Sequence, residues 1–84
     1  MADYAAEYAI VTGGSQGIGL AICRRLKAEG LIPVIFDRVA PDDAGLGEFR
    51  AVDLSNIEET KAALDWALAL GPVSRLVNNV GMVL

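Results

Sequence analysis

The sequence lacks most of the features that mark secreted, membrane-spanning or nucleic-acid-binding chains. It contains one cysteine, Cys23, so an internal disulfide is excluded and a reducing compartment is expected. Its charged residues are dispersed and its net charge is −4, which argues against binding to nucleic acid or to an anionic membrane surface. No basic segment precedes an apolar run, and the apolar runs are too short to span a membrane. We therefore expect a soluble cytoplasmic chain.

Apolar segments and helical repeats alternate along the 84 residues, of which 54% are hydrophobic. They predict strands at residues 8–12, 32–36, 48–52 and 74–78, helices at 18–29 and 56–70, and a loop at 38–47 with at most a short helical turn. Right-handed crossovers between parallel strands give the spatial order 3-2-1-4, with the helices on opposite faces. The prediction is one small α/β domain with three layers, α/β/α, and an incomplete doubly wound sheet.

The spacing of apolar residues also predicts which helix faces are buried. The first helix would bury a stripe of four residues: Ile18, Ala21, Ile22 and Leu26. The second would bury a face made by Ile57, Thr60, Leu64, Ala67 and Leu68. Its other stripe, with Ala62, Ala63, Trp66 and Leu70, would contact a partner or further structure, or remain partly exposed. A capping box between Ser55 and Glu58 is expected to start this helix.

The stretch YAIVTGGSQGIGL, residues 8–20, changes from strand pattern to helix pattern across four glycines. Glycines at positions of close approach let an anion reach the main chain, and a helix amino terminus attracts negative charge. The pattern is G-x-x-x-G-x-G, and no Lys-Ser/Thr pair follows it as in a P-loop. It predicts a phosphate site, although such turns also occur as simple tight connections. The candidate residues are Gly13, Ser15, Gln16, Gly17, Ile18 and Gly19.

An acidic residue, Asp37, ends the second strand, 24 positions after Gly13. A carboxylate there can accept hydrogen bonds from both hydroxyls of an adenosine ribose, and it would repel a 2′-phosphate. Arg38 could pair with that phosphate, but Asp37 offsets the attraction and Gln16 adds no second positive charge. NAD is therefore favoured over NADP as the cofactor.

Two further motifs follow strands of the predicted sheet: Asp53-Leu54, and Asn78-Asn79-Val80-Gly81. By spacing alone, Asp53 is equally compatible with a turn residue before a helix, and asparagines after a strand are often simple turn formers. Together with T-G-x-x-x-G-I-G and the strand-end acid, however, they occur in an order that resembles the short-chain dehydrogenase/reductase family, over residues 8–81. The family carries N-N-A-G where this chain has N-N-V-G, and the larger valine could narrow the wall of the pocket.

This resemblance implies a Rossmann-type dinucleotide-binding domain, of which residues 1–84 would be the amino-terminal part. It implies that Asp53 and Leu54 contact the adenine, and that Asn79, Val80 and Gly81 line the cofactor pocket. The complete protein would be an oxidoreductase that transfers a hydride between the cofactor and an alcohol or carbonyl substrate, as a homodimer or homotetramer.

The catalytic part is expected to lie outside this chain. The family relies on Y-x-x-x-K with a serine and a further asparagine, and no lysine stands four residues after Tyr4 or Tyr8. No catalytic residue or metal ligand is therefore assigned, and the 84 residues alone are expected to be inactive. A non-catalytic nucleotide-binding or interaction module is the alternative, and a methyl-donor-binding fold is less favoured by the glycine spacing.

Overall fold

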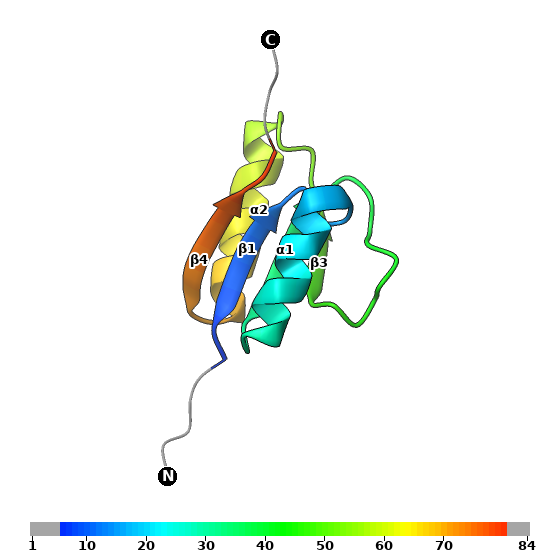
Figure 1. Ribbon diagram of the computed structural model, residues 1–84. Coiled ribbons are helices and arrows are strands. Elements are labelled where there is room, and N and C mark those ends of the chain that lie inside the picture. Colours follow the sequence, from blue (N-terminus) through cyan, green and yellow to red (C-terminus); the bar gives the residue numbers. More distant parts are fainter. Residues whose placement is uncertain (1–5, 81–84) are drawn as a thin grey trace.

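The computed structural model of the chain describes residues 6–80, which form four strands and two helices (Figure 1). In chain order these are β1 (Tyr8–Thr12), α1 (Gly17–Ala28), β2 (Ile32–Asp37), β3 (Glu48–Ala51), α2 (Ile57–Leu70) and β4 (Val73–Asn78). Every predicted strand and helix is present, and each boundary lies within one residue of its expected position. In the described part of the chain, neither helix has the length and apolar character needed to cross a bilayer.

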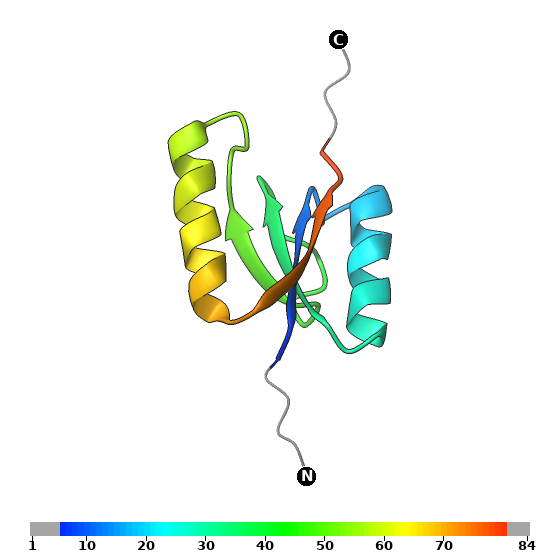
Figure 2. The same ribbon diagram turned by 90° about the vertical axis from the view of Figure 1, so that its left-hand side faces the viewer.

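The four strands form one parallel sheet in the order β3-β2-β1-β4. Viewed along the sheet, α1 and α2 cover opposite faces (Figure 2). The predicted three-layer architecture and strand order are confirmed. Because all four strands run in the same direction, their carboxyl ends meet at one edge of the sheet, where ligands bind in doubly wound folds.

The alternation of side chains along the central strands divides the core into two clusters. From β1, Ala9 and Val11 face α1 whereas Ile10 faces α2, as expected for successive residues of a strand. The cluster under α1 comprises Ala9, Val11, Cys23, Leu26, Leu31, Ile35 and Leu46, and the cluster under α2 comprises Ile10, Val34, Phe36, Val52, Ala63 and Ala67. Both faces of β1 and β2 are therefore buried, which explains their continuous apolar sequences.

The predicted buried face of α1 is only partly correct. The helix buries Gly19, Cys23 and Leu26, whereas Ile18 is 74% exposed and Ala21 is also exposed. The small residues at 19 and 23 let the helix approach the sheet closely, so the larger Ile18 lies outside the contact. The helix ends as expected, because Gly30 has a φ of 90° and takes the left-handed position after the cap.

The predicted buried face of α2 is mostly wrong, because only Ala67 of that face is fully buried. Ala63 and Ala67 are fully buried, and Trp66 and Leu70 pack beside them against the cluster under α2. These residues come largely from the stripe expected to be left without a partner within the domain. The larger residues of the predicted face, Ile57, Leu64 and Leu68, are 82%, 37% and 61% exposed. Alanines face the sheet because they allow the helix backbone to come close to it.

The expected capping box at the start of α2 is also wrong. Asn56 is the N-cap, and its side chain accepts a hydrogen bond from the Glu59 backbone N–H at 3.0 Å. Ser55 instead bonds through its amide and its hydroxyl to Asp53 Oδ1. Since the Ser55 side chain is held in the turn after β3, the next residue caps the helix.

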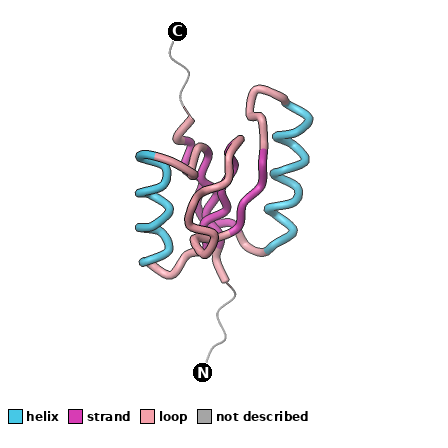
Figure 3. Tube along the Cα trace, turned by 90° about the vertical axis from the view of Figure 1, so that its right-hand side faces the viewer, coloured by secondary structure: helices cyan, strands magenta, loops and turns pink. Residues whose placement is uncertain are grey.

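The segment from Arg38 to Gly47 is an irregular loop, with no helical turn (Figure 3). Leu46, 2% exposed, anchors the loop in the cluster under α1. The Lys27 ammonium donates a hydrogen bond to the Gly45 carbonyl, which ties the loop to the end of α1. The loop thus connects the carboxyl end of β2, just after Asp37, to the amino end of β3 at the opposite end of the sheet.

Candidate functional site

The turn between β1 and α1 carries two left-handed glycines. Gly13 has a φ of 67° and Gly17 a φ of 57°, a region that disfavours residues with a Cβ. A Cβ built on Gly17 would meet no atom within 4 Å, so the mouth of the helix is open there. The turn therefore presents accessible backbone beside the positive end of the α1 dipole, as the glycine pattern predicts.

Two other glycines of the turn serve packing. A Cβ on Gly19 would overlap the Gly13 carbonyl oxygen, so α1 can lie against the turn only if this position has no side chain. A Cβ on Gly14 would come within 2.9 Å of Cys23 Sγ and 3.0 Å of Ile35 Cγ2. Both contacts are shorter than ordinary van der Waals distances. These two glycines hold the helix in place, while Gly17 leaves its end open.

The polar residues of the turn differ in their surroundings. Ser15 is 4% exposed, and its buried Oγ has no hydrogen-bond partner among the described residues. An unsatisfied buried hydroxyl is costly, so this side chain retains capacity for a polar ligand at the turn. Gln16 and Ile18 are exposed, and Gln16 takes the N-cap position in an extended conformation without a side-chain cap bond. The first turn of α1 thus leaves its N–H groups unoccupied by a capping side chain.

Thr12 joins the turn to the end of β4, and sequence reasoning did not select it as a site residue. Its Oγ1 donates to Asn78 Oδ1 at 3.2 Å and accepts from the backbone N–H groups of Asn79, at 2.9 Å, and Val80, at 3.3 Å. Asn79 in turn donates through Nδ2 to the Gly13 carbonyl at 3.3 Å. The signal available was a lone hydroxyl at the carboxyl end of the first strand, where this fold places its ligands.

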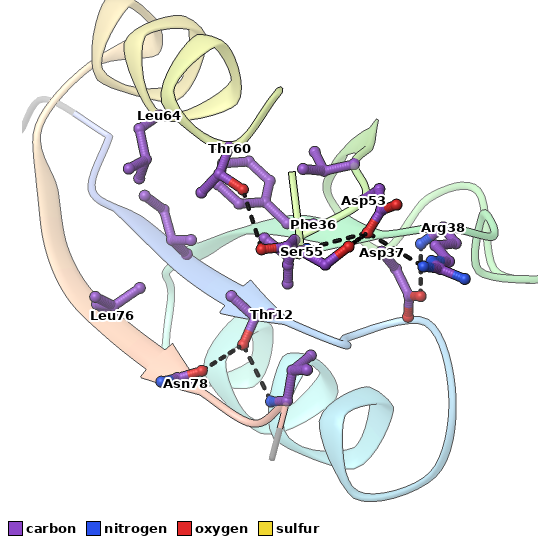
Figure 4. Close-up of a pocket in the computed structure, with 14 residues that line it drawn as sticks. Thr12, Phe36, Asp37, Arg38, Asp53, Ser55, Thr60, Leu64, Leu76 and Asn78 are labelled. Carbon is purple, nitrogen blue, oxygen red and sulfur yellow. Dashed lines mark hydrogen bonds and ion pairs between the residues drawn. The ribbon is translucent and has the colours of Figure 1, made fainter. Parts of the chain in front are cut away.

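A cavity of about 600 Å³ opens between α2 and the carboxyl ends of the strands (Figure 4). Leu64 and Leu76 lie towards one end of the cavity, and the polar side chains of Asp37, Arg38, Asp53 and Ser55 lie together at the other end. Its lining residues are Ile10, Thr12, Phe36, Asp37, Arg38, Val52, Asp53, Leu54, Ser55, Thr60, Leu64, Leu76, Asn78 and Val80. A mostly apolar cleft with a polar rim suits a flat heteroaromatic ring attached to a hydroxylated sugar.

Asp37 connects this cavity to the glycine turn. Its Oδ2 accepts a hydrogen bond from the Ser15 backbone N–H at 3.2 Å, and its Oδ1 accepts one from the Arg38 N–H at 2.7 Å. The carboxylate therefore lies between the helix mouth and the cavity. That is the position expected of a group that binds the sugar between a base and a pyrophosphate.

Asp53 lies at the polar end of the cavity, and three hydrogen-bond donors surround its carboxylate. The Ser55 hydroxyl (2.6 Å) and amide (3.0 Å) both donate to Oδ1, and Arg38 Nη2 lies 3.1 Å from the same oxygen. These hydrogen bonds, the Ser55 bonds first and the Arg38 bond next, hold the pKa of Asp53 below its usual range. The carboxylate is thus ionised at neutral pH.

The structure brings the predicted site residues to one edge of the sheet in two connected groups. Asp37, Arg38, Asp53, Leu54 and Val80 line the cavity. The remaining described members, Gly13, Ser15, Gln16, Gly17, Ile18, Gly19 and Asn79, form or contact the turn beside it, and Gly81 lies outside the described residues. Within residues 6–80, no three His, Cys, Asp or Glu side chains are grouped so as to hold a metal ion.

Comparison with known proteins gives consistent matches over nearly the whole chain. A family model described as short chain dehydrogenase matches residues 7–84. Galactitol 2-dehydrogenase (L-tagatose-forming) of Cereibacter sphaeroides is 39% identical over 82 residues, covering 88% of this chain and 32% of the relative.

Two solved structures resemble the chain closely. An aldohexose dehydrogenase of Thermoplasma acidophilum in ligand-free form superposes with a TM-score of 0.84 at 35% identity, over 92% of this chain and 30% of that one. A 3-oxoacyl-[acyl-carrier protein] reductase of Brucella melitensis, in complex with NAD, gives 0.80 at 36% identity, over 95% and 35%. The chain therefore spans about a third of the length of these proteins, and 14% of an oxidoreductase of Bacillus subtilis that is 35% identical to it.

Proposed function

This chain belongs to the short-chain dehydrogenase family, and on that premise we propose that it is the amino-terminal, cofactor-binding part of an oxidoreductase that uses NAD. The complete protein would transfer a hydride between the nicotinamide and an alcohol or carbonyl substrate. The observation that carries the proposal is that Asp37 joins the two parts of the site, because it accepts from the Ser15 N–H of the glycine turn and also lines the cavity between the strands and α2.

The residues present fit a dinucleotide along this surface. The open backbone at Gly17 and the first turn of α1 would receive the pyrophosphate, with the unsatisfied Ser15 hydroxyl beside it. Asp37 would accept from the ribose hydroxyls, and the cavity behind Asp53 and Leu54 would enclose the adenine. The nicotinamide would supply the hydride acceptor or donor. The Thr12 hydroxyl accepts hydrogen bonds from the backbone of Asn79 and Val80, and it would thereby hold the segment after β4 against the start of the glycine turn.

NAD is preferred over NADP in this proposal because the ribose end of the cavity is acidic. Asp37 and Asp53 both line it, and the single basic residue among the described lining, Arg38, is already paired with Asp53. A 2′-phosphate would approach two carboxylates and one neutralised guanidinium. The reaction centre would lie outside these 84 residues, and the chain alone would bind cofactor without turnover.

The test replaces Gly17 with valine in the full-length protein and measures NAD affinity by calorimetric titration. A side chain there would occupy the space at the helix mouth, so we expect the dissociation constant to rise more than about tenfold, as when a charge-assisted hydrogen bond is lost. Gly30→Val is the matched control, because Gly30 is also left-handed and its Cβ would also meet nothing within 4 Å, but it lies at the far end of α1.

Both substitutions should lower the melting temperature to a similar extent, since each forces a Cβ into the left-handed region. Only Gly17→Val should weaken NAD binding. Equal affinities in the two variants would contradict the phosphate assignment, and a wild-type protein that binds neither NAD nor NADP would overturn the proposed function as a whole.

A further inference from the structure

Arg38 and Asp53 form an ion pair at the polar end of the cavity, beyond the ends of two neighbouring strands (Figure 4). Asp37 is paired in register with Ala51, and the Val52 N–H bonds to the Asp37 carbonyl. Arg38 follows Asp37 directly and Asp53 follows Val52, so both residues lie just beyond the paired ends of β2 and β3. Their side chains meet with Nη2 3.1 Å from Oδ1.

The Arg38 guanidinium pairs with Asp53 and not with the carboxylate of its neighbour in the sequence, Asp37. Its own neighbour, Asp37, accepts only the Arg38 backbone N–H and directs its second oxygen to Ser15. The guanidinium instead extends across to Asp53, which is itself oriented by the amide and hydroxyl of Ser55. Asp53 is thus a fixed anchor that holds Arg38 over β3.

We propose that Asp53 is a positioning residue for cofactor choice, because it holds Arg38 away from the ribose 2′-position and so disfavours a 2′-phosphorylated dinucleotide. This inference rests on the proposed function and adds to it a residue other than the strand-end acid. An arginine directly after that acid is well suited to a phosphate, since its planar guanidinium can donate two parallel hydrogen bonds. Pairing with Asp53 engages Nη2 of this fork and offsets its positive charge.

The expected size of the effect follows from the exposure of the pair. The Arg38 and Asp53 side chains are 70% and 40% exposed. Exposed pairs are weak and screened by salt, so removing the partner should change the relative affinity for NADP about two- to fivefold. The same change should shrink as ionic strength is raised, because the guanidinium–phosphate contact that replaces the pair is also exposed.

The experiment measures dissociation constants of NAD and NADP for the full-length protein by calorimetric titration, in a double-mutant cycle. Asp53→Asn keeps the size of the side chain and its ability to accept from Ser55, but removes the charge that holds Arg38. We expect it to lower the ratio of the NADP to the NAD dissociation constant about two- to fivefold. In the Arg38→Ala background, the same substitution should change that ratio less than half as much on a logarithmic scale.

Glu29→Gln is the matched control. It converts a carboxylate to an amide in another exposed ion pair, with Arg25 at 2.9 Å, at the far end of α1, and it should leave the ratio unchanged. An equal shift in both Arg38 backgrounds would mean that the negative charge of Asp53 acts directly, which overturns the proposal, and so would no shift at all. If the wild-type protein binds neither dinucleotide, the proposed function fails with it; if it binds them and only the ratio is insensitive, only this inference fails.

Discussion

Cys23 illustrates how buried side chains pack against the glycine turn and hold it in place. Its side chain is fully buried, and Sγ would lie within 2.9 Å of a Cβ at Gly14. The thiol therefore fills the space that the glycine leaves between α1 and β2. Burial raises the pKa of Cys23 to about 11. Cys23 is thus a small buried hydrophobe whose thiol has little tendency to ionise.

We expect the native thiol of Cys23 to react slowly with iodoacetamide and to gain reactivity with pH up to about 11. The unfolded chain should instead level off near the ordinary value of 9.0. Because the folded pKa is raised, the contribution of this group to stability is complete below pH 9.0 and is lost as the pH rises towards 11. Mass spectrometry of the alkylated chain gives the rates, and circular dichroism confirms folding at each pH. A native profile that levels off near 9.0 would show that the thiol is accessible to water.

At the scale of elements, the helices show where periodicity is informative and where it is ambiguous. The existence, type and order of all six elements follow from short apolar segments, helical spacing and glycine signals. The buried face of α2 does not, because apolar residues surround most of this helix. The face that contacts the sheet is the one with Ala63 and Ala67, because these small residues permit close approach, and Leu68 lies outside the contact. Side-chain size decides which face of such a helix is buried, and a hydrophobicity pattern carries no information about size.

The start of α2 provides a direct test at this scale. Asn56→Ala should lower the free energy of unfolding by about 1 kcal/mol, because the Glu59 N–H loses its acceptor at the first turn. Ser55→Ala is the control, since its hydroxyl bonds to Asp53 on the exposed side of the turn and not to the helix. Urea denaturation of the full-length protein measures both. A larger loss for Ser55→Ala would restore the capping box that the sequence suggested.

At the scale of the whole molecule, the site is predictable because parallel strands deliver their carboxyl ends to one edge. Knowing only that Asp37 and Asp53 each follow a strand is enough to place them together beside the glycine turn. The pairing of Arg38 with Asp53 could not be predicted in this way, because it depends on side-chain conformations after the strands end. Neither could the bonds of Thr12, which need the register between β1 and β4.

The outer side of β4 is the part of the described molecule least covered by its own residues. β4 ends the sheet, and Leu76, 65% exposed, forms an apolar surface with Leu64 where both line the cavity on the α2 side. Exposed strand edges with apolar side chains promote association. We therefore expect the 84-residue chain, expressed alone, to self-associate in sedimentation velocity at micromolar concentration.

Leu76→Lys should shift this association towards monomer, because it places a charge on both the open edge and the apolar surface. Val39→Lys makes the same chemical change at a residue of similar exposure, 57%, in the loop after β2, and it should have little effect. Far-ultraviolet circular dichroism of both variants establishes that the comparison is between folded chains. If the two substitutions reduce association equally, general charge repulsion explains the result. A chain that stays monomeric without any substitution would contradict the prediction, since the open edge and its apolar surface would then be insufficient to drive assembly.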